Sequence, residues 1–140
     1  MSTHMTLEAM QADLDDQGFC GFLQIKAVSV DAGQGILVLA LPYRSDLTRD
    51  PADGHIHGGV IGAFLDTAAT YALLARGAQN CPTVNYRVDL LRPVVQSAMH
   101  AKAIVRKQGR MLATVDVELT DDAGKLCATA RATFAILDAG

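Results

Sequence analysis

The sequence has 140 residues, the size of one ordinary domain, and half of them are hydrophobic, which is enough to bury a core. A formal net charge of −3 argues against a nucleic-acid-binding surface, which needs an excess of Lys and Arg. Asp66 interrupts the longest apolar run and the first residues are mixed and polar, so we expect neither a membrane span nor a secretory leader. The cysteines Cys20, Cys81 and Cys127 have no framework spacing, which predicts reduced thiols and a cytoplasmic protein.

The first part of the chain predicts a helix, two strands and a loop. Residues 6–16 have apolar positions three and four apart and predict a short amphipathic helix ended by Gly18. Residues 19–30 indicate a strand with poor alternation, and residues 36–41 indicate a second strand. Residues 43–57 contain proline and glycine, have no period, and predict a loop.

Residues 58–77 predict one long helix that ends at a C-terminal glycine. At ~1.5 Å per residue this helix is about 28 Å long. It is apolar on nearly every side, so it must be wrapped by protein or by lipid. The carboxylate of Asp66 in its middle argues against lipid.

The segments after this helix alternate with a period of two, as strands with one buried face do. They are residues 83–92, 98–107, 111–120 and 126–137. The first of these segments has Val84, Tyr86, Val88 and Leu90 on one face and Thr83, Asn85, Arg87 and Asp89 on the other. Short connections between the segments predict an antiparallel meander.

Together the elements predict an α+β fold in which an antiparallel sheet of about six strands curls around the long central helix. A sheet with one apolar face buries such a helix by curling round it. No repeat, linker or low-complexity stretch interrupts the sequence. We therefore expect a single domain over residues 1–140, with residues 1–18 as an N-terminal helical segment.

Asp66 is the first candidate for chemistry, because apolar residues precede and follow it in the central helix. An unpaired carboxylate is costly to bury. Two interpretations stay open: a reactive carboxylate, or a structural one that is bonded to Thr70, Tyr71 or a distant Arg.

The second candidate is the run His57-Gly58-Gly59 at the start of this helix. Two glycines expose backbone N–H groups where the helix dipole is positive, which favours a polarised carbonyl or a developing oxyanion. The alternative is a tight turn that enters a helix.

Geometry couples the two candidates. Gly58 and Asp66 are eight residues apart, or roughly 12 Å along one helix. A base or nucleophile and an oxyanion donor must both lie within ~3 Å of the reacting group. If both act on one carbonyl, they come from different chains, so the catalytic interpretation predicts a dimer with two equal sites.

Motifs for cofactors and metals are missing. The sequence has no GxSxG, GxGxxG or GK[ST] motif, so we expect no cofactor. His55 and His57 form an HxH pair that could share a metal on a strand, but no further ligand is nearby in the sequence, and we expect no metal site.

Two stretches resemble one family. The sequence GHIHGGVIGAFLDTA, with an Asp nine residues after the His of HGG, and the later VDLLRP are similar to PaaI-like acyl-CoA thioesterases of the hotdog superfamily. The resemblance covers nearly the whole chain in order. It implies a hotdog fold, hydrolysis of an acyl-CoA thioester, and a homodimer or a dimer of dimers.

The resemblance also implies roles at matching positions. Asp66 is expected to activate water or to attack the thioester, and the N–H of Gly58 to polarise its carbonyl. His57 is expected to bind near the sulfur or the carbonyl, or to orient the loop. Thr83 matches a position where the family often has a Ser or Thr that helps to place water. Gly59 is expected to line the substrate site beside Gly58.

One position departs from the family, which commonly has an Asn shortly before HGG. Asp50 is the counterpart here and is predicted to contact substrate, where its charge could repel Asp66 or alter substrate preference. Arg92, Arg106 and Lys107 are predicted to hold the phosphates of coenzyme A; the alternative for each is a solvated sheet face.

Two other functions remain open. A hotdog hydratase or dehydratase would pair His57 with Asp66 over an enoyl or β-hydroxyacyl chain. The second alternative is a non-catalytic domain that binds acyl-CoA, because the sequence lacks the Asn that the family commonly has before HGG. Cys127, His100 and Tyr71 are interpreted as structural.

Overall fold

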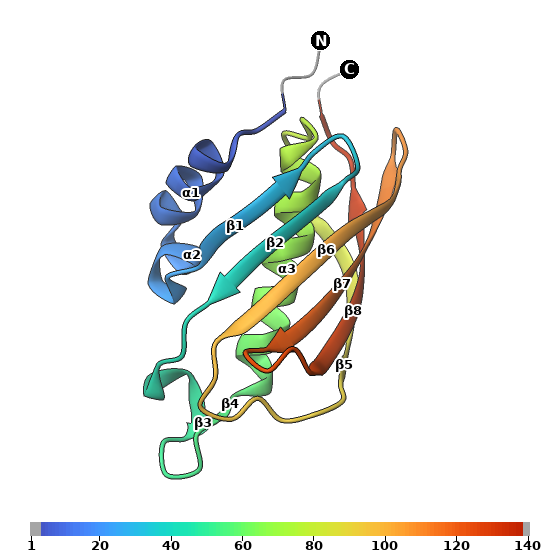
Figure 1. Ribbon diagram of the computed structural model, residues 1–140. Coiled ribbons are helices and arrows are strands. Elements are labelled where there is room, and N and C mark those ends of the chain that lie inside the picture. The colour runs from blue at the N-terminus through green and yellow to red at the C-terminus, as the bar shows by residue number, and fades with distance from the viewer. Residues whose placement is uncertain (1–3, 139–140) are drawn as a thin grey trace.

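The computed structural model describes residues 4–138 and contains two short helices, one long helix and a curled sheet (Figure 1). The helices are α1 (Leu7–Asp16), α2 (Gly18–Leu23) and α3 (Gly58–Ala75). The main sheet contains β1 (Lys26–Asp31), β2 (Ile36–Leu41), β5 (Thr83–Leu90), β6 (Met99–Gln108), β7 (Leu112–Asp121) and β8 (Leu126–Ala135). A 3₁₀ turn (Ser45–Leu47) precedes a small hairpin of β3 (Thr48–Asp50) and β4 (His55–Ile56).

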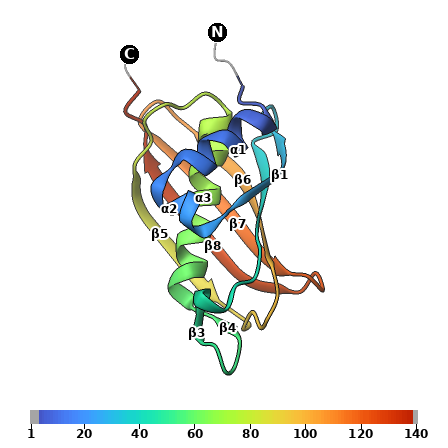
Figure 2. The same ribbon diagram turned by 90° about the vertical axis from the view of Figure 1, so that its left-hand side faces the viewer.

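The six strands of the main sheet lie in the order β1-β2-β6-β7-β8-β5, and every pairing is antiparallel. Helix α3 lies against one face of this sheet (Figure 1), and α1 and α2 lie beside α3 near β1 (Figure 2). The predicted α+β fold, a sheet of six antiparallel strands around a long helix, is confirmed.

The core lies between α3 and the inward side chains of the strands. On β6, for example, Met99, Ala101 and Ala103 are buried and alternate with more exposed residues. Helix α3 is long and apolar enough to cross a membrane, but 56% of it is buried inside the fold. Its apolar surface is therefore explained by its place as the core helix of this sheet.

The strand predicted for residues 19–30 is wrong in its first half, where the chain forms α2. Gly21 allows this turn, since a Cβ there would lie 2.7 Å from the carbonyl oxygen of Asp15. Gln24 ends the helix in the left-handed conformation (φ 63°). Arg44 donates to the last two carbonyls of α2 at 3.1 and 2.9 Å. Because Arg44 is more than 20 residues away in the sequence, a local sequence pattern cannot reveal this stabilising contact.

The predicted meander is wrong at its first strand. β5 pairs with β8 at the edge of the sheet, while β6 pairs with β2. The connection 91–98 is long enough to cross the end of the sheet between β5 and β6. The loop predicted for residues 43–57 contains the small hairpin β3–β4, which is bonded to this connection by the amide of Ile56 and the carbonyl of Val94 (2.9 Å).

Candidate active site

Asp66 lies in the middle of α3, half-buried, in the wall of a cleft of about 290 Å³ between α3 and the segment α1–α2. The other lining residues are Asp13, Gln17, Cys20, Thr67, Thr70, Tyr71 and Leu74. The hydroxyl of Thr83 donates to Oδ1 of Asp66 at 2.8 Å. One carboxylate oxygen is thereby fixed, and Oδ2 has no hydrogen-bond partner among residues 4–138.

The interpretation of Asp66 as a carboxylate bonded to Thr70, Tyr71 or an Arg does not fit these contacts. The hydroxyl of Thr70 donates to the main-chain carbonyl of Asp66 (2.9 Å), and Tyr71 bonds to Asp13 instead. Within the described part of the chain, no Arg or Lys pairs with Asp66. The carboxylate is therefore accessible at a cleft and held by a single neutral donor.

Thr83 reaches Asp66 because of a β-bulge. Simple alternation assigned Thr83 to the face of β5 opposite Tyr86, and this assignment is wrong. The pairing of β5 with β8 shifts register between Thr83 and Asn85, so one extra residue turns Thr83 toward α3. Bulges commonly re-aim a side chain next to a functional site.

The start of α3 presents a free amide. His57 is the N-cap, and its Nδ1 accepts a hydrogen bond from the N–H of Gly59 at 2.8 Å. Its own N–H donates to the carbonyl of Leu47 at 2.9 Å, which fixes the approach to the helix. Among residues 4–138 the N–H of Gly58 has no acceptor. It therefore remains available to a ligand at the positive end of an 18-residue helix.

Gly58 lines its own cleft, of about 280 Å³, together with Arg49, His55 and Arg92. Arg49 forms an ion pair with Asp53 at 2.8 Å. This cleft is lined by basic groups, whereas no Lys, Arg or His lines the cleft of Asp66. In one chain the two candidate groups thus lie in different clefts of opposite character.

The remaining predicted substrate contacts are dispersed. Asp50 caps the turn of the β3–β4 hairpin, where it accepts from the N–H of Ala52 at 2.9 Å, and it lines neither cleft. Arg106 lies on the outer face of the sheet, paired with Asp116 at 2.8 Å, and Lys107 is exposed on β6. Of the three basic residues predicted to hold phosphates, the structure brings Arg92 close to Gly58.

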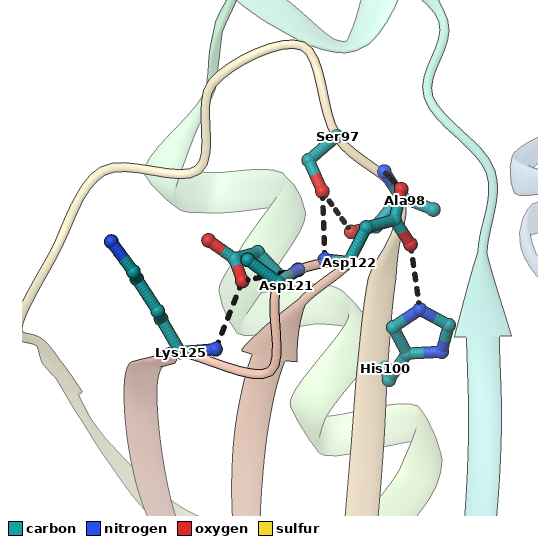
Figure 3. Close-up of polar contacts among 7 residues, drawn as sticks. Ser97, Ala98, His100, Asp121, Asp122 and Lys125 are labelled. Atoms are coloured by element: carbon teal, nitrogen blue, oxygen red, sulfur yellow. Dashed lines mark hydrogen bonds and ion pairs between the residues drawn. The ribbon is translucent and has the colours of Figure 1, made fainter.

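A second polar cluster contains Ser97, His100 and Asp122 at the start of β6 (Figure 3). His100 Nε2 lies 2.9 Å from Oδ1 of Asp122. The hydroxyl of Ser97 donates to the carbonyl of Ala98 (2.8 Å) and accepts from the N–H of Asp122 (3.0 Å). The hydroxyl does not bond to the imidazole, as a Ser-His-Asp nucleophile requires. The cluster ties the loop before β6 to the turn between β7 and β8.

Of the residues that line this cleft, only Asp66 was among the predicted site residues. Asp13, Cys20 and Tyr71 are three that were not. Burial, together with the carboxylate of Asp13, raises the pKa of Tyr71, so its phenol stays protonated and donates to Asp13 at 2.6 Å. Burial raises the pKa of Cys20, so its thiol stays neutral at pH 7. Positions five apart on a helix point about 140° apart, so the spacing of Tyr71 from Asp66 gave no signal, and the approach of α1 could not be predicted from a local pattern.

Comparison with known proteins decides the family. The family model described as "Thioesterase superfamily" matches residues 53–128, which contain HGG, Asp66 and most of the sheet. The chain belongs to the thioesterase superfamily. The human protein named acyl-coenzyme A thioesterase 13 is 33% identical over 112 residues, covering 77% of this chain and 78% of the human one.

Other members agree in sequence and fold. The Escherichia coli protein named acyl-coenzyme A thioesterase PaaI is 26% identical over 132 residues, covering 92% of this chain and 89% of its own. The crystal structure of zebrafish thioesterase superfamily member 2 superposes with a TM-score of 0.82 at 28% identity, covering 94% and 99% of the two chains. The resemblance to PaaI-like hotdog enzymes is confirmed, as is the prediction that this thioesterase is a hydrolase.

Proposed function

We propose that this thioesterase hydrolyses an acyl-CoA to the free acid and coenzyme A, at sites that each combine Asp66 of one subunit with Gly58 of another. The observation that carries the proposal is that both groups lie on α3, in two separate clefts, about 12 Å apart along the helix. A single chain cannot bring both to one carbonyl. We therefore propose a homodimer, alone or as a dimer of dimers, in the cytoplasm.

The exposed edge of the sheet supports this assembly. β5 pairs on one side only, and its exposed apolar residues include Tyr86 (43%) and Leu90 (57%). Both lie close to the first half of α3: a Cβ on Gly58 would be 2.9 Å from Leu90, and one on Gly62 would be 3.7 Å from Tyr86. Antiparallel pairing of two β5 strands around a twofold axis continues the sheet, covers this surface, and sets two α3 helices side by side in opposite directions.

In such a dimer the thioester carbonyl oxygen accepts a hydrogen bond from the N–H of the partner's Gly58. This bond stabilises the negative charge that develops on the oxygen. Oδ2 of Asp66 either takes a proton from a water whose oxygen bonds to the carbonyl carbon, or bonds to that carbon itself. The C–S bond then breaks, and the sulfur leaves as a thiolate that takes up a proton. In the second case the acyl group is then held on Asp66 as an anhydride, and a water molecule adds to its carbonyl carbon, which releases the free acid and restores the carboxylate. Thr83 holds Oδ1, so the carboxylate keeps one orientation. A thioester is already activated, so the reaction needs no metal or cofactor.

The neighbours of Gly58 complete the substrate site in this proposal. Because Nδ1 of His57 accepts from Gly59, its neutral imidazole carries the proton on Nε2, which is then a donor for the sulfur or carbonyl region. Gly59 leaves the backbone unobstructed. Arg92 lines this cleft and forms no ion pair among residues 4–138, whereas Arg49 is paired with Asp53, so Arg92 is the cation proposed to bind a phosphate of coenzyme A. Arg106, Lys107 and Asp50 line neither cleft, so the proposal assigns phosphate binding to Arg92.

The test is Asp66→Asn, which keeps the shape of the side chain and its bond to Thr83 but removes the charge. We expect kcat for thiol release from acyl-CoA to fall roughly 10²- to 10⁴-fold, while the oligomer persists in size-exclusion chromatography. Turnover like that of the wild type rejects the proposal. Hydration of an enoyl-CoA by the wild type identifies a hydratase instead, and tight acyl-CoA binding without thiol release identifies a binding domain.

A further inference from the structure

Two carboxylates, those of Asp66 and Asp13, line the same cleft, together with polar and apolar neighbours. On α3 its lining residues are 66, 67, 70, 71 and 74, which share one helix face and span about 12 Å. From Asp66 to Tyr71 the distance along the axis is about 7.5 Å. Asp13 of α1 and Gln17, which follows α1, line the cleft from the other side. An acyl group whose carbonyl lies at Asp66 and whose chain follows α3 toward its C-terminus passes the pair formed by Tyr71 and Asp13.

The far end of the cleft has a free acceptor. The phenol of Tyr71 donates to Oδ2 of Asp13, and Oδ1 of Asp13 has no donor among residues 4–138. The hydroxyls of Thr67 and Thr70 already donate to main-chain carbonyls of α3, at 2.8 and 2.9 Å. The side chains of this end without a full set of partners among residues 4–138 are thus Asp13, through Oδ1, and Gln17, and the charge is on Asp13.

The electrostatics of the cleft favour the same kind of group. Asp13 and Asp66 both line it, and none of its lining residues is Lys, Arg or His. A plain alkyl chain desolvates Asp13 without replacing its bonds to water, which is unfavourable. An acyl group that ends in a carboxylate meets a like charge. A terminal hydroxyl, in contrast, donates a charge-assisted hydrogen bond.

We propose that Asp13 is a specificity-determining residue, which selects acyl groups with a hydroxyl at the far end and excludes those that end in a carboxylate. This inference rests on the proposed acyl-CoA hydrolysis at Asp66. A six-carbon acyl chain is the first length to test, because five extended carbon–carbon bonds of about 1.5 Å each reach roughly 6 to 7 Å, similar to the rise of ~7.5 Å from Asp66 to Tyr71 along the helix.

The test compares hexanoyl-CoA, 6-hydroxyhexanoyl-CoA and 5-carboxypentanoyl-CoA, which differ only at the far end. For the wild type we expect kcat/KM to be about 10-fold higher for the hydroxy substrate than for hexanoyl-CoA, and at least about 10-fold lower for the carboxylated one, mostly through KM. Asp13→Asn keeps an acceptor for Tyr71 and removes the charge. We expect it to raise kcat/KM for the carboxylated substrate about 10-fold. We also expect it to raise kcat/KM for hexanoyl-CoA, because the alkyl chain no longer desolvates a charge, so that the preference for the hydroxy substrate falls to about threefold or less.

Asp16→Asn is the matched control, since Asp16 is exposed on the same helix and does not line the cleft. It makes the same change in net charge, and we expect the preferences of the wild type to persist. If the wild type cleaves all three substrates equally well, or if Asp16→Asn shifts the preference as much as Asp13→Asn does, the role of Asp13 is refuted. If none of the three, nor any other acyl-CoA, is cleaved, it is the proposed function that fails.

Discussion

The hydroxyl of Thr83, the first residue of β5, donates to Oδ1 of Asp66 in the middle of α3 at 2.8 Å. This bond joins the edge strand to the core helix at the candidate reactive carboxylate. It leaves Oδ2 directed to the cleft, and it depends on the bulge between Thr83 and Asn85. Thr83 is thus a positioning residue in the proposed reaction.

Replacing Thr83 by Val tests this role, because Val has the same shape without the hydroxyl. We expect kcat to fall roughly 10-fold or more with KM within about twofold, since the carboxylate loses its orientation before the chemical step. Thr83→Ser is expected to restore most of kcat. A merely structural role predicts instead that Thr83→Val lowers the melting temperature and leaves kcat unchanged, which thermal unfolding and steady-state kinetics distinguish.

The amide of Gly58 can be removed without removing the helix. Proline is favoured at the first position of a helix, and His57 already has the extended conformation that a residue before proline needs (φ −61°, ψ 133°). We expect Gly58→Pro to lower kcat by about 10²- to 10³-fold, since one oxyanion donor is lost. Gly58→Ala is the control: it brings a Cβ against the flexible end of Leu90 as Pro does, but keeps the N–H. Equal losses in both variants contradict the role of the amide.

The proposed interface predicts that a charge on the edge strand separates the subunits. In a dimer of Tyr86→Lys, each subunit places one lysine in the proposed interface. We therefore expect the dissociation constant of the dimer to rise by roughly 100-fold. Met111→Lys is the control, because Met111 is also apolar and exposed (79%) but lies in the turn between β6 and β7. Analytical ultracentrifugation measures both. A dimer of Tyr86→Lys as tight as that of Met111→Lys contradicts pairing through β5.

On the outer face of the sheet, Asp116 makes a contribution to the free energy of unfolding that depends on pH. Hydrogen bonds from Arg131 and then Arg106 lower the pKa of Asp116 to about 2. A carboxyl whose pKa is lowered by folding stabilises the fold above its ordinary pKa of about 3.9, and this stability is lost as the pH falls through about 2. We expect Asp116→Asn to lower the free energy of unfolding by about 1 kcal/mol at pH 7, after screening of the exposed Arg partners, and by much less near pH 2.

Chemical denaturation at the two pH values measures this difference. Glu118→Gln on the same face is the control, because Glu118 forms no ion pair within residues 4–138. An Asp116→Asn effect that is the same at both pH values contradicts this explanation.

The sequence was sufficient to predict the parts of the fold that follow one period. Helix α3 is apolar all round and begins and ends within two residues of its predicted bounds. The strands β6, β7 and β8 alternate strictly enough to be located within two residues of their predicted bounds. It could not predict the pairing of β5 with β8, because a connection of eight residues allows either neighbour.

Part of the candidate site depends on contacts between residues that are far apart in the sequence, and this part could not be predicted from local patterns. Asp66 and Gly58 were predicted because a carboxylate in an apolar helix and a glycine pair at its start are local features. The turn of Thr83 toward Asp66 depends on a bulge that adds one residue to a strand, which breaks the alternation on which the prediction relied. Asp13 and Tyr71 are 58 residues apart in the sequence and meet only because α1 lies against α3.

Complementation between two inactive variants measures the shared site most directly. Asp66→Asn and Gly58→Pro are unfolded together, refolded as a one-to-one mixture, and assayed for thiol release from acyl-CoA. Half of the dimers are then mixed, and each mixed dimer has one site with both an intact Asp66 and an intact Gly58, so we expect about a quarter of wild-type activity to return. If both groups act within one chain, every site in the mixture keeps a defect, and activity stays at the level of the separate variants.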